Sequence, residues 1–403
     1  MESEYTLIVL GGGAAGFFST ISAKEANPDQ KVLLLEKTNS LLSKVRVSGG
    51  GRCNVTHACF DPIQLSKYYP RGEKELIGPF TRFQPSDTIQ WFLSRGVHLK
   101  TENDGRMFPV TDSSQTIIDC LMREAEKIGV EIQLRTRVRE VEKKNDSFHV
   151  FMEDGTTLTS SHLLLATGSQ PQGYSIARSF GHTIQEPVPS LFTFNIPDSP
   201  FTDLSGIVIK NASLHLVDSP FVQTGPLLIT HWGFSGPAAL KLSAWGARFL
   251  HERKYQTPLR VNWLPEFTPD QLIAKLNEEK QKSPSQAIST WNPFELPKNL
   301  WKRLVERSVE GCKRLSDLSK EKLCKLAQDL QQDMFNINGK TTNKEEFVTC
   351  GGVTLNEVNF KTMQSRLCPH LFFAGEILDI DAVTGGFNFQ NAWTTGWIAG
   401  QSI

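Results

Sequence analysis

The stretch Leu7-Ile-Val-Leu-Gly-Gly-Gly-Ala-Ala-Gly16 decides the fold, because it leads from an apolar strand into a helix through a turn made of glycines. In this pattern Gly11 permits the tight turn, Gly13 lets the backbone approach a ligand, and Gly16 allows the helix to pack closely on the strand. A helix that begins after such a turn presents free N–H groups and a positive dipole end to a pyrophosphate. The stretch therefore predicts a dinucleotide-binding site.

An acidic residue follows this stretch at the spacing that the site requires. The helical pattern stops at Asn27-Pro28, and a second apolar strand is predicted over Lys31–Leu35. Glu36 ends that strand, 20 residues after Gly16, where a carboxylate accepts hydrogen bonds from a ribose diol. Such glycines alone often serve only a tight turn. The sequence of strand, turn, helix, strand and acid favours a nucleotide site.

The composition of the 403-residue chain excludes several classes of protein. Its 43 Lys and Arg residues balance 43 Asp and Glu residues, so the overall charge does not favour nucleic acid or an acidic membrane. Acidic Glu2 and Glu4 stand where a secretion signal would be basic, and polar residues and prolines interrupt the uncharged stretch 221–240. Seven cysteines without paired metal spacing suit a reducing compartment. We therefore expect a cytoplasmic protein without metal, membrane or nucleic-acid partners, and the sequence leaves its oligomeric state open.

Two different patterns divide the chain into domains. Residues 1–189 and 346–403 form one α/β pattern, whereas residues 190–345 combine short strands, punctuated by proline and glycine, with charged helices. The predicted strands are 131–140, 148–153, 163–166, 192–196, 207–209 and 259–263, and the predicted helices are 86–94, 113–128, 269–282, 297–309 and 319–334. The pattern indicates an α/β protein with an inserted domain, a small β-barrel or sheet plus helices, which we expect to cover the substrate.

A glycine-rich loop is predicted at Ser48-Gly-Gly-Gly-Arg-Cys-Asn54. Glycines have no Cβ atom, so this backbone can approach a flat ring or a diphosphate, and Arg52 offers a permanent cation beside it. A flexible loop with a solvated arginine is the alternative, because glycine turns are common. Taken alone, the segment does not separate the two interpretations.

The C-terminal region contains a second turn from strand to helix. An apolar strand leads into Gly375–Asp381, and Thr384–Asn388 opens a helix with one face of apolar and small residues. The N–H groups around Gly386 would stabilise the N1–C2=O edge of a flavin, which becomes negative on reduction. Glu376 or Asp379 would bind ribitol or ribose hydroxyls. An ordinary capped turn is the alternative, but it accounts poorly for this density of glycines and acids.

Together these motifs resemble the HI0933-like, or BaiN-like, family of bacterial NAD(P)/FAD-dependent oxidoreductases over almost the whole chain. The glycine loop and the C-terminal block are much more specific than the first glycine motif. The resemblance rests on GGGAAG (11–16), EK (36–37), SGGGRCN (48–54), GRMFP (105–109), ATG (166–168), THWGFSGP (230–237), CGGV (350–353) and GEILDIDAVTGGFNFQNAW (375–393).

The resemblance implies an α/β, Rossmann-like flavoprotein fold of the two-dinucleotide-binding-domain type, with noncovalent FAD and an inserted β-barrel-plus-helical domain. It also implies relatives that reduce or oxidise activated C–C or C–N bonds, one branch acting on unsaturated 3-oxo bile acids. The residues expected to bind the cofactor are Gly11, Gly13, Ala14, Ala15, Gly16, Glu36, Lys37, Ser48, Gly49, Gly50, Arg52, Cys53, Asn54, Val138, Thr167, Gly168, Gly375, Glu376, Asp379, Gly385, Gly386, Phe387 and Asn388.

Two departures from the family pattern concern the walls of the site. Only Ser169–Gly173 separates Gly168 from the helix predicted to start near Tyr174, where such proteins usually carry a longer Gly/Ser/Thr-rich loop. Ala382 stands where a glycine is usual in the C-terminal block. The shorter loop is expected to change one wall, so FAD binding is carried over to this chain and a particular substrate is not.

Hydride transfer at flavin N5 is the expected mechanism, with the protein supplying orientation, electrostatics and exclusion of water. Arg106 and Arg52 are the candidates for polarising a carbonyl or holding a carboxylate, because arginine is a fixed and permanently charged fork. His231 is the candidate acid or base, since its proton moves near neutral pH. A structural role is the alternative for each, and an isolated histidine is more often structural than catalytic.

Three functional classes remain open. An FAD-dependent oxidoreductase that acts on a small unsaturated carbonyl or amine leads. A flavoprotein of RNA modification and a redox-sensing flavoprotein without turnover are the alternatives, and the balanced net charge weighs against RNA. No second GxGxxG motif with a following acid lies between Gly168 and Gly351, so we expect NADH or NADPH only as a transient donor.

Overall fold

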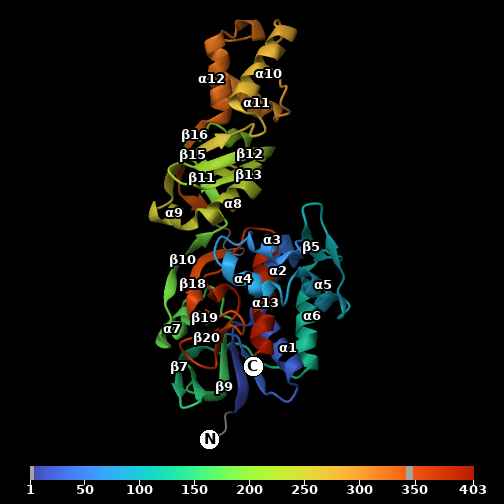
Figure 1. The fold of residues 1–403 in the computed structure, drawn as a ribbon, viewed down its shortest axis with the longest axis vertical. Coiled ribbons are helices and arrows are strands. Elements are labelled where there is room, and N and C mark those ends of the chain that lie inside the picture. The colour runs from blue at the N-terminus through green and yellow to red at the C-terminus, as the bar shows by residue number, and fades with distance from the viewer. Residues whose placement is uncertain (1–3, 342–347) are drawn as a thin grey trace. The chain divides into compact units, whose positions relative to one another are not determined.

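The computed structural model describes residues 4–341 and 348–403, which fold as two compact units (Figure 1). Unit 1 comprises Met1–Val188 and Lys344–Ile403, and unit 2 comprises Pro189–Asn343. Unit 2 is thus one continuous segment inserted into unit 1. The predicted boundary between residues 345 and 346 lies outside the described residues.

Unit 1 is built on a sheet of nine strands whose centre is parallel, in the order β6-β2-β1-β9-β21. These strands are β1 (Tyr5–Leu10), β2 (Val32–Leu35), β6 (Glu131–Gln133), β7 (Val138–Lys144), β8 (Ser147–Met152), β9 (Thr157–Leu165), β19 (Val358–Asn359), β20 (Gln364–Ser365) and β21 (Leu371–Phe373). Leu10 is in register with Leu35 and Leu165, and Leu165 is in register with Phe373. The residues that follow these strands therefore meet at one edge of the sheet.

The helices of unit 1 confirm several sequence predictions and correct others. They are α1 (Ala14–Ala26), α2 (Ser43–Gly51), α3 (Pro62–Ser66), α4 (Glu73–Phe80), α5 (Pro85–Leu93), α6 (Ser114–Lys127), α7 (Pro171–Ser179) and α13 (Phe387–Gln401), with 3-10 turns η3 (Leu355–Glu357) and η4 (Gly375–Ile377). Helix α7 begins at Pro171 rather than near Tyr174, so the segment after Gly168 is shorter still. The single strand predicted over 131–140 is divided into β6 and β7, and Arg135 between them has a left-handed φ of 56°.

Two smaller sheets complete unit 1. The strands are β3 (Thr56–His57), β4 (Leu99–Thr101) and β5 (Arg106–Pro109), in the order β3-β5-β4, and β10 (Ile184–Ser190), which pairs with β18 (Val348–Val353). In the first sheet, His57 lies opposite Arg106 on the neighbouring strand. This sheet therefore places Arg106, a predicted site residue, beside a histidine that the sequence did not single out.

Helices α1 and α13 pack closely because small residues line their contact. A Cβ added to Gly400 would lie 2.5 Å from Ser19 O and 2.7 Å from Ala23 N, and both are backbone atoms that cannot swing away. Beside this crossing, the ring of Phe18 lies 4.9 Å from that of Trp393. The small-residue face predicted for the last helix is therefore the face that contacts the first helix.

Replacing Gly400 by alanine is expected to lower the free energy of unfolding by about 1–3 kcal/mol, because the added methyl overpacks the crossing of α1 and α13. The intrinsic helix preference of alanine, about 1 kcal/mol, opposes this loss without cancelling it. Urea denaturation followed by far-UV circular dichroism measures the difference. A variant more stable than the wild type would contradict the close crossing.

Unit 2 contains the predicted barrel. Its strands are β11 (Thr193–Asn195), β12 (Val208–Leu216), β13 (Val222–Ile229), β14 (Gly233–Ser235), β15 (Gln256–Asn262), β16 (Asp333–Asn338) and β17 (Lys340–Thr341), in the order β16-β15-β12-β13-β14-β11-β17. The two end strands of this order, β16 and β17, are consecutive in the chain and are separated only by Gly339. The sheet therefore closes on itself, with one bent chain segment completing the ring.

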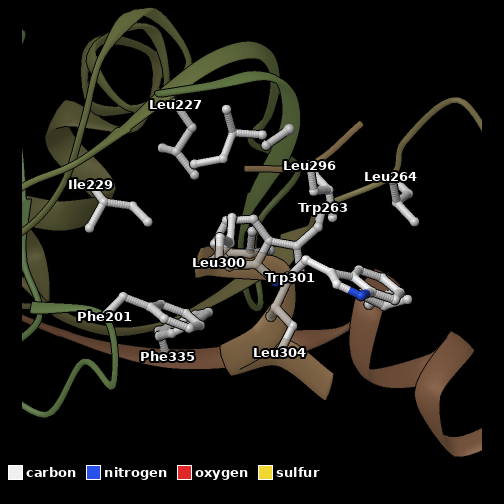
Figure 2. Close-up of a cluster of buried hydrophobic side chains, with 14 of the residues drawn as sticks. Phe201, Leu227, Ile229, Trp263, Leu264, Leu296, Leu300, Trp301, Leu304 and Phe335 are labelled. Carbon is white, nitrogen blue, oxygen red and sulfur yellow. The ribbon is translucent and has the colours of Figure 1, made fainter. Parts of the chain in front are cut away.

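The helices of unit 2 are α8 (Pro237–Trp245), α9 (Ala247–Glu252), α10 (Pro269–Lys282), α11 (Lys298–Ser308) and α12 (Lys320–Gln331), with 3-10 turns η1 (Thr202–Leu204) and η2 (Leu315–Asp317). The predicted helix 319–334 is too long, because Met334 already belongs to β16, where buried and exposed residues alternate. Figure 2 shows the core of this unit, in which Trp263 packs edge-on against Phe201 at 5.6 Å. The indole N–H of Trp263 is satisfied by Asp333 at 3.1 Å.

Candidate cofactor and active site

The glycines of the first motif serve two different purposes. Gly11 has a φ of 114°, and a Cβ there would lie 2.4 Å from Ala166 O, while a Cβ on Gly16 would lie 2.0 Å from Gly11 O. These two glycines are required by the packing of the protein itself. Gly13 has an extended backbone that any residue can adopt, and no atom of the described residues lies within 4 Å of its ideal Cβ. Its neighbourhood at the N-terminus of α1 therefore offers the open approach that a pyrophosphate needs.

Glu36 is held by the same turn. Its Oε2 accepts from Gly12 N–H and its Oε1 from Thr38 N–H, both at 2.9 Å. The sequence predicted a ribose partner only, and these backbone donors are an addition to that prediction. Each carboxylate oxygen can accept more than one hydrogen bond, so the fixed carboxylate retains capacity for a ribose hydroxyl.

The shortened segment after Gly168 is tied to two of the predicted cofactor-binding residues. Lys37 Nζ donates to Gln170 Oε1 at 2.6 Å. The side-chain amide of Gln172 donates to Val138 O. The start of α7 is thus bonded to Lys37, which follows β2, and to the first residue of β7. These two bonds order the wall that was predicted to differ from the family pattern.

Buried hydroxyl groups gather around Glu376. Glu376 forms an ion pair with Lys44, and its Oε1 accepts from Thr349 N–H at 3.1 Å. Within the described part of the chain, Thr167 Oγ1, Tyr174 OH and Thr349 Oγ1 are buried without a hydrogen-bond partner. Burial, followed by the charges of Glu376 and Asp379, raises the pKa of Tyr174 and keeps its hydroxyl protonated. Buried hydroxyls normally have partners, so this cluster fits a bound group that is rich in hydroxyls, such as the ribityl chain of FAD.

The N-terminus of α13 is held rigidly. Gly386 has a φ of 92°, and a Cβ there would lie 2.5 Å from Thr56 O. In the amide orientation that gives both its oxygen and its nitrogen a partner, Asn54 accepts a hydrogen bond from Gly386 N–H and donates one to Thr56 O, both at 3.0 Å. Asn388 exchanges two hydrogen bonds with the backbone of Ala382. Asn54 and Asn388, both predicted to bind cofactor, are therefore used to fix the turn itself.

Ala382 is accommodated at its place in this turn. Its φ is not positive, so the departure from the glycine usual in the family causes no backbone strain. Its N–H and C=O are both bonded by Asn388, at 3.0 and 3.1 Å. The remaining N–H groups of the first turn of α13 have no intrahelical acceptor, which suits the negative edge of a reduced flavin.

The glycine loop forms a kinked helix end rather than a flexible loop. Gly49, Gly50 and Gly51 all have positive φ, and only Gly49 is crowded, with its ideal Cβ 3.0 Å from the ring of Phe108. Among the residues that the structure describes, no atom lies within 4 Å of an ideal Cβ on either of the other two glycines. Cys53 is fully buried, which raises its pKa to about 12, so its thiol is a packing group and not a nucleophile.

The structure brings the two predicted arginines together. Arg52 and Arg106 both pair with Glu102, at 2.7 and 2.9 Å, on different oxygens of the carboxylate. Both guanidinium groups lie over the ring of Phe108, at 3.9 and 5.5 Å from its centroid. Arg52 is therefore a fixed cation, as one of the two sequence interpretations proposed. Its carboxylate partner was not predicted.

His57 is a second residue that the sequence analysis missed. The Phe387 ring, at the start of α13, stacks on His57 at 4.6 Å and on Tyr68 at 4.2 Å, and the rings of His57 and Tyr68 are 5.8 Å apart. The backbone O of Asp104 is 3.1 Å from His57 Nε2. The signal that could have located this region is Asn103-Asp-Gly105, a hairpin turn that sets Glu102 opposite Arg106.

His231 belongs to unit 2 and lies in the turn between β13 and β14. Its side chain is exposed, as is that of the neighbouring Trp232. The backbone of the turn is fixed by Thr230, whose Oγ1 accepts from the N–H groups of Trp232 and Gly233 at 3.3 and 3.2 Å. The turn thus presents both rings to solvent from a rigid backbone.

The sequence profile described as the HI0933-like protein Rossmann domain matches residues 5–402. The chain belongs to the HI0933-like family. It is 29% identical over 405 residues to the 3-dehydro-bile acid delta(4,6)-reductase of Clostridium scindens, covering 98% of both chains. It is 30% identical over 414 residues to the ribosomal RNA dihydrouridine synthase of Escherichia coli, covering 99% of this chain and 98% of that relative.

The fold is also similar to that of solved dehydrogenases. The 3-ketosteroid-delta4-(5alpha)-dehydrogenase of Rhodococcus jostii has a TM-score of 0.52 at 13% identity, covering 100% of this chain and 97% of that chain. The 3-ketosteroid delta1-dehydrogenase of Sterolibacterium denitrificans has a TM-score of 0.51 at 11% identity, covering 98% of both. These likenesses bear on the fold. Taken with the family, they confirm an oxidoreductase with a Rossmann-like flavoprotein fold.

The described residues, 4–341 and 348–403, contain neither a candidate membrane span nor a candidate metal site. No helix there is long and apolar enough to cross a membrane. No group of three or more His, Cys, Asp and Glu residues in that part of the chain is arranged to hold a metal ion.

Proposed function

We propose that this protein is a reductase of C=C bonds conjugated to a carbonyl, with a small unsaturated molecule as its substrate. The observation that carries the proposal is the chemistry shared by its relatives. A delta(4,6)-reductase and a dihydrouridine synthase both saturate a ring C=C bond, and in uridine that bond is conjugated to a carbonyl. An amine substrate would need the reverse, oxidative direction, which neither name indicates.

FAD is the proposed cofactor, and when bound in its reduced form it supplies the hydride. Gly13 and the N-terminus of α1 would hold the pyrophosphate, and Glu36 the ribose. Glu376, with the hydroxyls of Tyr174 and Thr349, would bind the ribityl chain. The open Gly50 would allow close approach of the ring.

Arg52 and Arg106 are the proposed electrophilic groups. Conjugate reduction adds a hydride to the β-carbon and a proton to the α-carbon, and negative charge develops on the carbonyl oxygen between these steps. A hydrogen bond from a fixed guanidinium to that oxygen strengthens as the charge develops, so it lowers the barrier. His231 remains the proposed proton donor. The variant His231→Asn is to be compared with the wild type in the turnover assay described next for Arg106.

Replacing Arg106 by alanine is expected to lower turnover at least about 10-fold, because losing one charge-assisted contact costs on the order of 1.5–3 kcal/mol. The FAD spectrum should stay nearly unchanged. Stopped-flow reoxidation of the reduced flavin by each acceptor measures the effect. Arg139→Ala is the matched control, since Arg139 pairs only with its exposed neighbour Glu140 among the ion pairs of the described residues. Normal turnover by Arg106→Ala would exclude Arg106 from the reaction.

The electron donor is expected to leave before the substrate binds. No dedicated nicotinamide motif is present in the sequence, so NADH or NADPH would reduce the flavin in the pocket that the substrate later uses. Steady-state kinetics with varied donor and enone should therefore give the parallel lines of a ping-pong mechanism. A stable ternary complex with donor and substrate would refute this order. If no acceptor reoxidises the reduced flavin faster than it is reoxidised in buffer alone, the protein is better explained as a redox sensor without turnover.

RNA is the second candidate substrate, because the Escherichia coli relative and a 30% identical relative from Haemophilus influenzae are both named ribosomal RNA dihydrouridine synthase. The balanced net charge of this chain does not favour a polyanion. One assay that compares free enones with uridine-containing RNA as substrates distinguishes the two candidates. Binding of RNA that falls steeply with salt, together with formation of dihydrouridine, would favour the second candidate.

A further inference from the structure

Glu102 occupies a special place between the two arginines. It directly follows β4 and starts the turn to β5, and its backbone N–H donates to Arg106 O at 2.8 Å. Its Oε1 accepts from Arg52 Nη1 and its Oε2 from Arg106 Nη2. One carboxylate therefore divides its two oxygens between two cations that come from different segments of the chain.

The environment of the two guanidinium groups is arranged around this carboxylate. Both lie over the single ring of Phe108, and Arg106 Nε also donates to Asp104 Oδ2 at 2.7 Å. Without an anion between them, two like charges over one ring would repel each other. No acceptor among the described residues forms a hydrogen bond with Arg52 Nη2 or Arg106 Nη1. Each arginine therefore keeps an N–H donor for a ligand.

There is also open space beside this cluster. A surface depression of about 370 Å³ is lined by Glu102, Asn103, Asp104 and Arg106. The side chains of Arg52, Glu102 and Arg106 are 34%, 29% and 39% exposed, so their ion pairs contribute little to the stability of the fold. A carboxylate that stabilises the protein so little and yet orients two cations suits a functional role.

We propose that Glu102 is a positioning residue, which holds Arg52 and Arg106 side by side so that both donate to the carbonyl oxygen of the substrate. The proposal rests on the function proposed above. Glu102 itself does not touch the reacting atoms. Its removal is therefore expected to act on the positions of the arginines and, through them, on kcat.

The first test measures the chemical reactivity of the two arginines directly and needs no substrate. Phenylglyoxal modifies accessible guanidinium groups, and peptide mass spectrometry identifies each modified residue. In Glu102→Ala, Arg52 and Arg106 should both react roughly five-fold faster than in the wild type, because the charge-assisted hydrogen bonds that hold them are lost. The modification rates in Glu102→Gln should lie between those of Glu102→Ala and those of the wild type. Asp112→Asn is the matched control, since Asp112 reaches Arg52 only at 3.5 Å.

The second test measures turnover of the intact FAD-loaded enzyme. Glu102→Ala should lower kcat about 10-fold with little change in FAD content or melting temperature, and added formate should restore part of kcat by replacing the missing carboxylate. Unchanged modification rates, an unchanged kcat, or no recovery with formate would each overturn the proposal. If the wild type reduces none of the enones, the proposed function fails, whereas the modification rates still decide whether Glu102 positions the arginines.

Discussion

Replacing Gly13 by aspartate is expected to give a folded protein that no longer binds FAD. Residue 13 is the N-cap of α1, and its extended backbone suits any residue. Within the part of the chain that the structure describes, no atom lies within 4 Å of an ideal Cβ at this position. Aspartate is a favoured N-cap, so the helix itself should gain stability. The same carboxylate would face the pyrophosphate. At about 4 Å and an effective dielectric constant near 20, the repulsion is about 4 kcal/mol, which weakens binding about 1000-fold.

The measurement compares the FAD content and the melting temperature of three proteins. Gly13→Asp should be purified colourless, with a melting temperature no lower than that of the wild-type apoprotein. Gly13→Asn is the matched control, because asparagine caps the helix equally well without the charge and should retain FAD more strongly. In the same experiment, the denatured wild type is expected to release FAD rather than FMN. Equal FAD content in Gly13→Asp and the wild type would overturn the pyrophosphate assignment.

The sequence was sufficient for those parts of the fold that depend on local pattern. The glycine turn, the helix that ends before Asn27 and the second buried strand all follow from residues that are close in the chain. The helix predicted over 269–282 has the same bounds in the structure, because Thr268 caps it and Pro269 starts it. Closure of the barrel was only one of two options from the sequence. It depends on the bend at Gly339, which joins two strands that pair with distant partners.

The details of the site depend on contacts between distant segments, which a single sequence does not reveal. Glu102 is 50 residues from Arg52, and Asn54 bonds the N-terminus of a helix that begins at Phe387. The hydroxyl of Tyr174, which has no hydrogen-bond partner among the described residues, belongs to a helix whose start the sequence placed too late. In each case the residue type suggested a polar role, but only the register of sheet and helix shows which partner it meets. The assignment of cofactor-binding and catalytic residues stays a prediction.

The strongest effect on stability is expected from the buried ion pair of Arg71 and Asp381. Asp381 is fully buried, and the side chain of Arg71 is 16% exposed. Two nitrogens of the guanidinium face the two carboxylate oxygens, and Arg71 Nε donates to Asp381 Oδ1 at 2.5 Å. Replacing Arg71 by methionine leaves a buried carboxylate without this cation. Removing one partner of a buried pair typically costs about 3–5 kcal/mol.

Thermal and urea denaturation of Arg71→Met measure this loss, and two further variants identify its cause. Lys282→Met is the matched control, because the pair of Lys282 and Glu278 is exposed on α10 and its loss should cost less than about 1 kcal/mol. Adding Asp381→Asn to Arg71→Met should recover part of the stability, since it removes the buried charge. A loss as small as that of Lys282→Met would contradict the importance of the buried pair.

The same variant should also lose affinity for FAD, although neither residue is proposed to touch it. Gly72, next to Arg71, packs against Ile380, since an ideal Cβ there would lie 2.8 Å from a side-chain carbon of Ile380. The ion pair thus fastens the segment that leads from Glu376 to the N-terminus of α13, which provides two of the proposed contacts to the cofactor. If Arg71→Met is less stable as apoprotein yet binds FAD as tightly as the wild type, the position of that segment is fixed by Asn54 and Asn388 alone.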